Sequence, residues 1–101
     1  MDAKLTIDDG IAIIALAGRF DVSASREFRT GYEAALEEPQ LREIRIDLAR
    51  VEYLDSSALG MLLLLKDRAD PRKITMSLTN CRGIVREILD VASFGSMFEM
   101  R

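Results

Sequence analysis

Hydrophobic and polar residues near the amino end alternate in a way that predicts two strands. The segment Ala3–Ile7 alternates and predicts a short strand. The pair Asp9-Gly10 favours a tight hairpin turn. The nearly continuous apolar run Ile11–Ala17 then predicts a strand that ends at Gly18 and is covered on both faces.

The spacing of apolar residues changes to a helical period after this hairpin. Ser23 and Ser25 are candidate N-caps, and Pro39 is expected to stop the helix. The apolar residues at helical spacing are Phe28, Tyr32, Ala35 and Leu36. The charged residues between them give this helix one apolar and one polar face.

Clean alternation in Glu43–Leu48 predicts the next strand. A short connection, Ala49–Leu54, leads to the polar cluster Asp55-Ser56-Ser57, where a second helix begins and extends to about Ala69. Pro71 disfavours helical geometry at the residue before it.

The last third of the chain repeats this strand-then-helix order. The segment Lys73–Leu78 alternates, and Asn80 is a candidate cap for a helix that extends to about Val91. The apolar residues of that helix are Ile84, Val85, Ile88, Leu89 and Val91. Ser93–Ser96 predicts a turn, and Met97–Met100 a last short strand.

Strands that alternate with helices of this length imply parallel neighbouring strands. We therefore predict a single α/β domain over residues 1–101, with a mixed, mostly parallel sheet covered by helices and an amino-terminal hairpin.

Composition limits the function classes. Hydrophobic residues make up 49% of the 101 residues and charged residues 31%, with a net charge of −3, which argues against a nucleic-acid binder. The longest apolar stretch, Ala58–Leu65, is too short to cross a membrane. The single cysteine, Cys81, and the absence of a signal-peptide pattern favour the cytoplasm.

The residue types give little support to catalysis. The chain has no histidine, one cysteine and no glycine-rich phosphate loop, so we expect no catalytic residue, no metal and no cofactor. Two catalytic interpretations are disfavoured. One makes Asp21 and Asp55 an acid/base pair, and the other makes Cys81 a reactive thiol.

The segment Asp55-Ser56-Ser57 has two interpretations. One of its side chains caps the helix start, which alone accounts for one or two polar residues. Alternatively, Ser56 is a phosphorylation site, since a phosphate at a helix start meets free amides and the positive end of the helix dipole. The added charge would then repel a bound partner.

The helix after this cluster also has two interpretations. Met61 and Leu64 either belong to the core or form a docking face near Ser56. Gly60 costs helix stability of about 1 kcal/mol relative to alanine, which indicates that the sheet or a partner packs close to it.

Asp55-Ser56-Ser57-Ala58-Leu59-Gly60, after a strand and opening a helix, resembles the signature of STAS domains, and more narrowly of bacterial anti-sigma factor antagonists. The resemblance covers nearly the whole chain. It includes Ala17–Asp21 after the second strand, the strand Ile44–Leu48 and the segment Leu89–Phe94.

This resemblance implies a partner switch. The unmodified antagonist captures an anti-sigma factor that is also a serine kinase of the histidine-kinase-like ATPase fold. The phosphorylated antagonist releases it, and a metal-dependent PP2C-type serine phosphatase resets the switch. It implies Ser56 as the phosphoacceptor, with Ser57 as the secondary candidate, and partner contacts at the residues Asp21, Asp55, Ser57, Ala58, Met61 and Leu64.

Two departures from the family pattern leave alternatives open. Ala58 stands where the family usually has glycine, and the family's last helix is expected to be missing or very short before Arg101, which would favour a homodimer.

One alternative is a STAS scaffold or accessory subunit of a transporter or stress complex. Another is the same phosphoswitch controlling secretion or motility.

Overall fold

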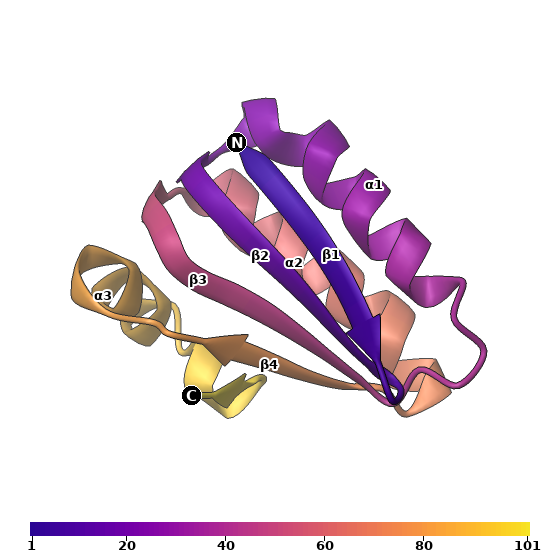
Figure 1. Cartoon of the computed structure of the whole chain (residues 1–101). Helices are drawn as coiled ribbons and strands as arrows, with labels where there is room; N and C mark the ends of the chain where they lie inside the picture. Colours follow the sequence, from indigo (N-terminus) through magenta and orange to yellow (C-terminus); the bar gives the residue numbers. More distant parts are fainter.

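The computed structural model describes residues 1–101, and its strands form one sheet in the order β1-β2-β3-β4-β5 (Figure 1). The strands β1 (Asp2–Asp8) and β2 (Ile11–Phe20) form the antiparallel hairpin. β3 (Glu43–Leu54), β4 (Thr75–Thr79) and β5 (Glu99–Met100) are added in parallel. This confirms the predicted mixed sheet.

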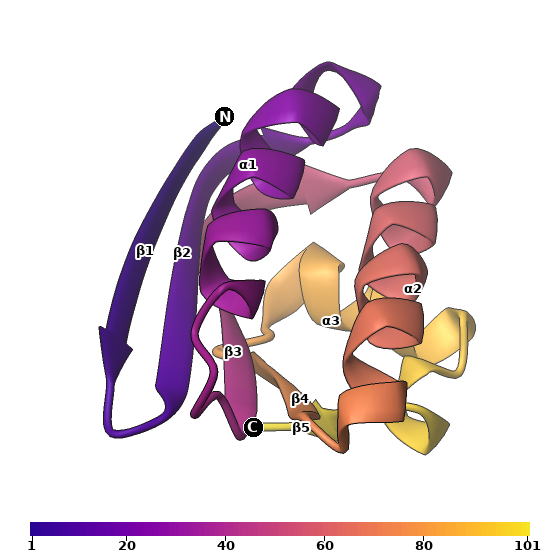
Figure 2. The same cartoon turned by 90° about the vertical axis from the view of Figure 1, so that its right-hand side faces the viewer.

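Three helices connect the parallel strands. α1 (Ser25–Leu36) joins β2 to β3, α2 (Ser56–Ala69) joins β3 to β4, and α3 (Gly83–Val91) joins β4 to β5. All three lie on the same face of the sheet (Figure 2). Crossovers between parallel strands are right-handed, so successive strands added in one direction place their helices on one side.

The hydrophobic core lies between this helical layer and the covered face of the sheet. The strands contribute Ala12, Ile14, Leu16, Ile44, Ile46, Leu48, Met76 and Leu78, all buried. The helices contribute Phe28, Leu62, Leu65, Val85 and Leu89. The alternation that predicted the strands therefore also indicates which side chains face the helices.

The opposite face of the sheet is uncovered, and Figure 1 looks onto it. Ile11, Ile13 and Ala15 lie on this face and are only half-buried, so the prediction that β2 is covered on both faces was wrong. Their cross-strand neighbours on β3 are Glu43, Arg45 and Asp47. The aliphatic stems of Glu43 and Arg45 stand beside Ile11 and Ile13, and such stems can cover part of an apolar surface without a second layer of helices.

β2 and β3 are longer than predicted. β2 continues through Gly18, whose φ of +103° accompanies shifts in register, and it pairs with β3 as far as Phe20 and Leu54. The predicted connection Ala49–Leu54 is therefore strand. A β-bulge places an extra residue in one strand, and the hydrogen bonds between β2 and β3 continue beyond it. The alternation of residues breaks at the bulge, so the pattern alone predicts strands that end too early.

The predicted caps of α1 and α3 were also wrong. Ser23 donates from its backbone amide (3.0 Å) to the Asp21 carboxylate, which caps a 3₁₀ turn before α1, and Ser25 is already the first residue of the helix. Asn80 has a φ of +59° and donates from its side chain to Asp47 (2.9 Å), while α3 begins later. Neither the Ser23 nor the Asn80 side chain accepts a hydrogen bond from a helix amide, so neither caps the predicted helix.

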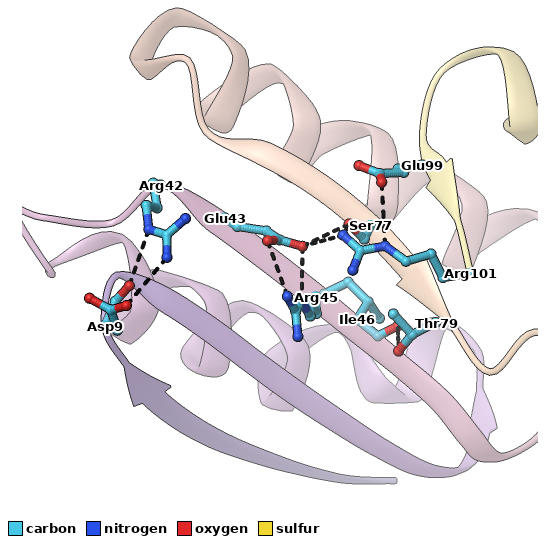
Figure 3. A network of polar contacts seen from close by, with 9 residues as sticks. All are labelled: Asp9, Arg42, Glu43, Arg45, Ile46, Ser77, Thr79, Glu99 and Arg101. Carbon is cyan, nitrogen blue, oxygen red and sulfur yellow. Dashed lines mark hydrogen bonds and ion pairs between the residues drawn. The ribbon is translucent and has the colours of Figure 1, made fainter.

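A polar network ties the carboxyl end of the chain to the uncovered face of the sheet (Figure 3). The Glu43 carboxylate accepts from Arg45 Nε at 2.9 Å, from the Ser77 hydroxyl at 3.0 Å and from Arg101 at 2.6 Å. Ser77 is fully buried and Glu43 largely so. The hydrogen bond from Arg45 and, to a lesser extent, those around it hold the pKa of Glu43 below its ordinary value of 4.5.

This network predicts a component of acid sensitivity. Because the folded pKa of Glu43 is depressed, the stabilisation is present above pH 4.5 and is lost as the pH falls through the folded pKa. We expect Glu43→Gln to lower the free energy of unfolding at pH 7 and to flatten its decline below pH 4.5, measured by urea unfolding. Glu27→Gln, a change at an exposed glutamate on α1 that makes no ion pair, is the control. Equal slopes for Glu43→Gln and the unmodified chain would contradict the prediction.

Candidate functional site

The parallel pairing of β2 with β3 brings two acidic turns together at one end of the sheet. Phe20 pairs with Leu54 at the end of both strands, and Asp21 and Asp55 follow directly. The Asp55 amide donates to the Phe20 carbonyl oxygen at 3.3 Å, which joins the two turns. The carboxyl ends of parallel strands are where α/β sheets present their functional groups.

Asp55 is the N-cap of α2. Its backbone is extended, and its carboxylate accepts from the Ala58 amide at 3.0 Å. Its carbonyl oxygen accepts from the Leu59 amide at 3.1 Å, the first bond of the helix. Asp55 therefore performs the capping role that the sequence left open between Asp55 and Ser56.

Ser56 and Ser57 are not needed for the cap. Ser56 is the first residue of α2 and is exposed, and Ser57 beside it is half-buried. Neither hydroxyl makes a hydrogen bond within the chain. The Ser56 hydroxyl is thus an exposed nucleophile at the amino end of a 14-residue helix, next to amides that lack partners inside the helix.

The Asp21 carboxylate is held in place on the neighbouring turn. It accepts from the hydroxyl and the amide of Ser23, and Arg19 Nε lies 3.8 Å away. The hydrogen bond from the Ser23 hydroxyl is the main cause that lowers the pKa of Asp21. The Arg19 guanidinium stacks 4.8 Å from the centre of the Tyr53 ring. Asp21 therefore stays ionised near the start of α2.

α2 has one buried and one exposed face. Its core residues are Ala58, Leu62, Leu65 and Ala69. Ser56, Gly60 and Leu64 are exposed at successive i, i+4 positions and form a crest along the outer side of the helix. Leu64 is 59% exposed and Met61 half-buried, so the structure places both at the surface.

Ala58 does not belong to this surface. It is 0% exposed, because it faces the sheet at the same helical angle as Leu62 and Leu65. Its methyl group fills the core, so we remove its side chain from the predicted partner contacts.

Gly60 has open space around it. A Cβ built there meets no atom within 4 Å, so the prediction that the sheet packs close to this glycine was wrong. Within the chain no contact requires glycine at this position.

Two surface features extend beyond the residues that the sequence predicts for the site. A groove between α1 and α2 is lined by Arg26, Phe28, Arg29, Tyr32, Met61 and Leu64. The outer side of α3 exposes Ile84 (49%) and Val91 (88%). The sequence contains a pattern that indicates each feature. Two arginines stand at i and i+3 in α1, and apolar residues lie on more than one face of α3.

The remaining chemistry of the chain is sparse. No three His, Cys, Asp or Glu side chains are grouped as metal ligands would be. Cys81 is half-buried, and burial raises the pKa of its thiol, which keeps the thiol protonated and poorly reactive. None of the helices combines the length and the apolar character that crossing a membrane requires.

Comparison with known proteins gives one consistent family. The family model described as "Mlab, STAS domain" matches residues 3–99. A STAS-domain containing protein of Pseudomonas aeruginosa (strain UCBPP-PA14) is 45% identical over 87 residues, which cover 86% of this chain and 84% of that one. BtrV of Bordetella bronchiseptica, provisionally named an anti-sigma factor antagonist, is 27% identical over 94% of this chain and 83% of its own length.

Solved structures share the fold at lower sequence identity. The anti-sigma factor antagonist SpoIIAA in its unphosphorylated form is 20% identical with a TM-score of 0.76, covering 98% of this chain and 86% of that one. Its phosphorylated Bacillus form gives a TM-score of 0.74 at 19% identity, covering 98% and 90%. The murine anion transporter Slc26a9 contains the fold too, with a TM-score of 0.73 at 16% identity over 85% of this chain and 14% of that one.

The division of roles at the start of α2 gives a stability prediction. We expect Asp55→Ala to lower the free energy of unfolding by about 1 kcal/mol, since the Ala58 amide loses its acceptor. Ser56→Ala should change it by less than about 0.5 kcal/mol, because no bond is lost. Urea unfolding of the two variants measures both values. A larger loss for Ser56→Ala than for Asp55→Ala would contradict the assignment of the cap.

The open space at Gly60 gives a second prediction. We expect Gly60→Ala to raise the free energy of unfolding by about 0.5–1 kcal/mol, because alanine loses less entropy in a helix and its methyl meets no neighbour. Thermal and urea unfolding provide the measurement. Gly10→Ala is the contrasting control and should be destabilising, because φ there is +75° and a Cβ would lie 2.7 Å from the Gln40 carbonyl oxygen. A destabilised Gly60→Ala would disprove the open environment.

Proposed function

Because the chain belongs to the STAS domain family, we propose that it is an anti-sigma factor antagonist controlled by phosphorylation of Ser56. The unmodified protein binds and sequesters an anti-sigma serine kinase of the histidine-kinase-like ATPase fold. Phosphorylation by that kinase releases it, and a PP2C-type serine phosphatase restores binding. We place this cycle in the cytoplasm and assign no catalytic step to the chain itself.

The observation that carries this proposal is the division of roles between Asp55 and Ser56. Asp55 holds the helix start through its bond to the Ala58 amide, while the neighbouring Ser56 hydroxyl is exposed and unbonded. A kinase can therefore modify Ser56 without removing an interaction that the fold uses. The name of BtrV and the two phosphorylation states of SpoIIAA agree with this function for the family.

The consequence of phosphorylation follows from charge. A phosphate on Ser56 adds roughly 1.5 to 2 negative charges at pH 7 beside the Asp55 carboxylate. The free amides and the dipole of α2 stabilise it in the isolated protein. In a complex, a partner surface over the same helix start meets like charge and must lose water, and like charges placed together at an interface are costly. The fold persists while the complex dissociates.

Mass spectrometry of the protein from its native cells tests the phosphoacceptor. We expect one phosphate in the intact mass and, after tryptic digestion, its location at Ser56 within Val51–Lys66. Ser57 lies in the same peptide, so fragmentation must separate the two serines. A phosphate on Ser57 alone would move the switch by one residue, and none under any growth condition would refute it.

Binding variants test the direction of the switch. Ser56→Ala should retain the kinase partner in a pull-down, and Ser56→Glu should bind it at least about tenfold more weakly, a difference of roughly 1.4 kcal/mol. Thr6→Glu, at an exposed position on the face of β1 that is turned away from α1 and α2, is the control for added negative charge. Equal affinity of Ser56→Ala and Ser56→Glu would sink the switch.

The second candidate is a STAS subunit that stays bound in a larger assembly. The occurrence of the fold in an anion transporter favours it. That function predicts a stable complex that co-purifies at constant amount whether or not Ser56 is modified, whereas the switch predicts that the modified protein is recovered free.

A further inference from the structure

The groove between α1 and α2 combines an apolar floor with a cationic rim. Phe28 is fully buried and Tyr32 nearly so, and their rings meet edge to face with centroids 5.3 Å apart. Phe28 also packs on Phe20, with ring centroids 5.0 Å apart. The floor is therefore closely packed, and Met61 and the exposed Leu64 form the wall contributed by α2.

The rim of the groove carries two arginines that have few ion-pair partners within the chain. Arg26 is exposed and makes no ion pair within 4 Å. Arg29 is paired only with Glu33, at 3.2 Å, and both side chains are largely exposed, so this pair contributes little. In a chain with a net charge of −3, the lining of this groove carries two arginines and no carboxylate.

The two arginines are spaced for a helical ligand. They stand at i and i+3 on α1, so both guanidinium groups line the same side of that helix, about one turn apart. A guanidinium pairs best with a carboxylate, which can accept two parallel hydrogen bonds. A helix with two carboxylates one turn apart and apolar side chains beside them matches both the rim and the wall.

We propose that this groove is the docking site for an acidic amphipathic helix of the partner protein, with its carboxylates on Arg26 and Arg29 and its apolar side chains on Met61 and Leu64. The inference rests on the proposed function only in taking the occupant to be a segment of the regulatory partner. It adds the chemistry of the contact, which is a negatively charged helix in a positively charged groove.

The location of the groove couples docking to Ser56. α1 and α2 begin at the same end of the molecule, since they follow the neighbouring ends of β2 and β3 (Figure 2). Arg26 lies in the first turn of α1 and Ser56 is the first residue of α2. A phosphate on Ser56 adds negative charge at the end of the molecule where both helices begin, and this charge repels the carboxylates of a docked acidic helix. A basic or neutral ligand would not be released in this way.

Two synthetic peptides test the groove without the natural partner. Both are 16-residue helices with one apolar stripe, and the first carries Glu at two positions one turn apart where the second carries Lys. We expect the Glu peptide to bind the full chain at least tenfold more tightly by fluorescence anisotropy at low salt. Amide and methyl NMR shifts should change in α1 and at Met61 and Leu64.

Variants of the chain complete the test. Arg26→Glu combined with Arg29→Glu should weaken the Glu peptide at least tenfold, while Arg50→Glu, an exposed arginine on β3 without an ion pair, should change it less than twofold. Circular dichroism verifies that each variant is folded. Equal binding of the Glu and Lys peptides, or shifts confined to the apolar side of α3, would overturn the proposal. The two proposals can fail separately. If the Glu peptide binds but the protein is never phosphorylated in cells, the docking groove is supported and the phosphorylation switch is rejected.

Discussion

The pairing of β2 with β3 along their full length determines the position of every group at the candidate site. Both strands extend to Phe20 and Leu54, and the hydrogen bond from the Asp55 amide to the Phe20 carbonyl closes the pair. Asp21 and Asp55 therefore leave the sheet side by side, and α1 and α2 start at the same end. The alternation of residues alone predicts shorter strands. Shorter pairing between β2 and β3 would separate the two turns, and α1 and α2 would then not start side by side to form the groove.

Asp55 turns this arrangement into a defined helix start. Its extended backbone and its bond to the Ala58 amide direct α2 over the sheet, with Leu62 and Leu65 inward and the crest Ser56, Gly60 and Leu64 outward. The functional surface is thus the outer side of a helix whose inner side is core. Its residues can be modified or contacted with little effect on the core, because they lie away from the sheet.

Much of the architecture could be read from the sequence because each buried position repeats with the period of its element. The mixed sheet, the Asp9-Gly10 hairpin and the extent of α2 follow from such periods. The ends of β2 and β3 did not, since a bulge at Gly18 changes the register and depends on pairing between distant segments. The uncovered face of β2 could not be predicted for a similar reason. Its apolar residues lie beside polar side chains of β3, and that pairing is not visible in the sequence of β2.

The separation of Asp55 from Ser56 also bears on chains that lack the serine. One residue secures the fold and its neighbour carries the exposed hydroxyl, so a single substitution at Ser56 can remove the hydroxyl while the helix cap and the grooves beside α2 remain. The fold therefore does not depend on the Ser56 hydroxyl, and a chain that lacks it would still present the same helix start and the same groove.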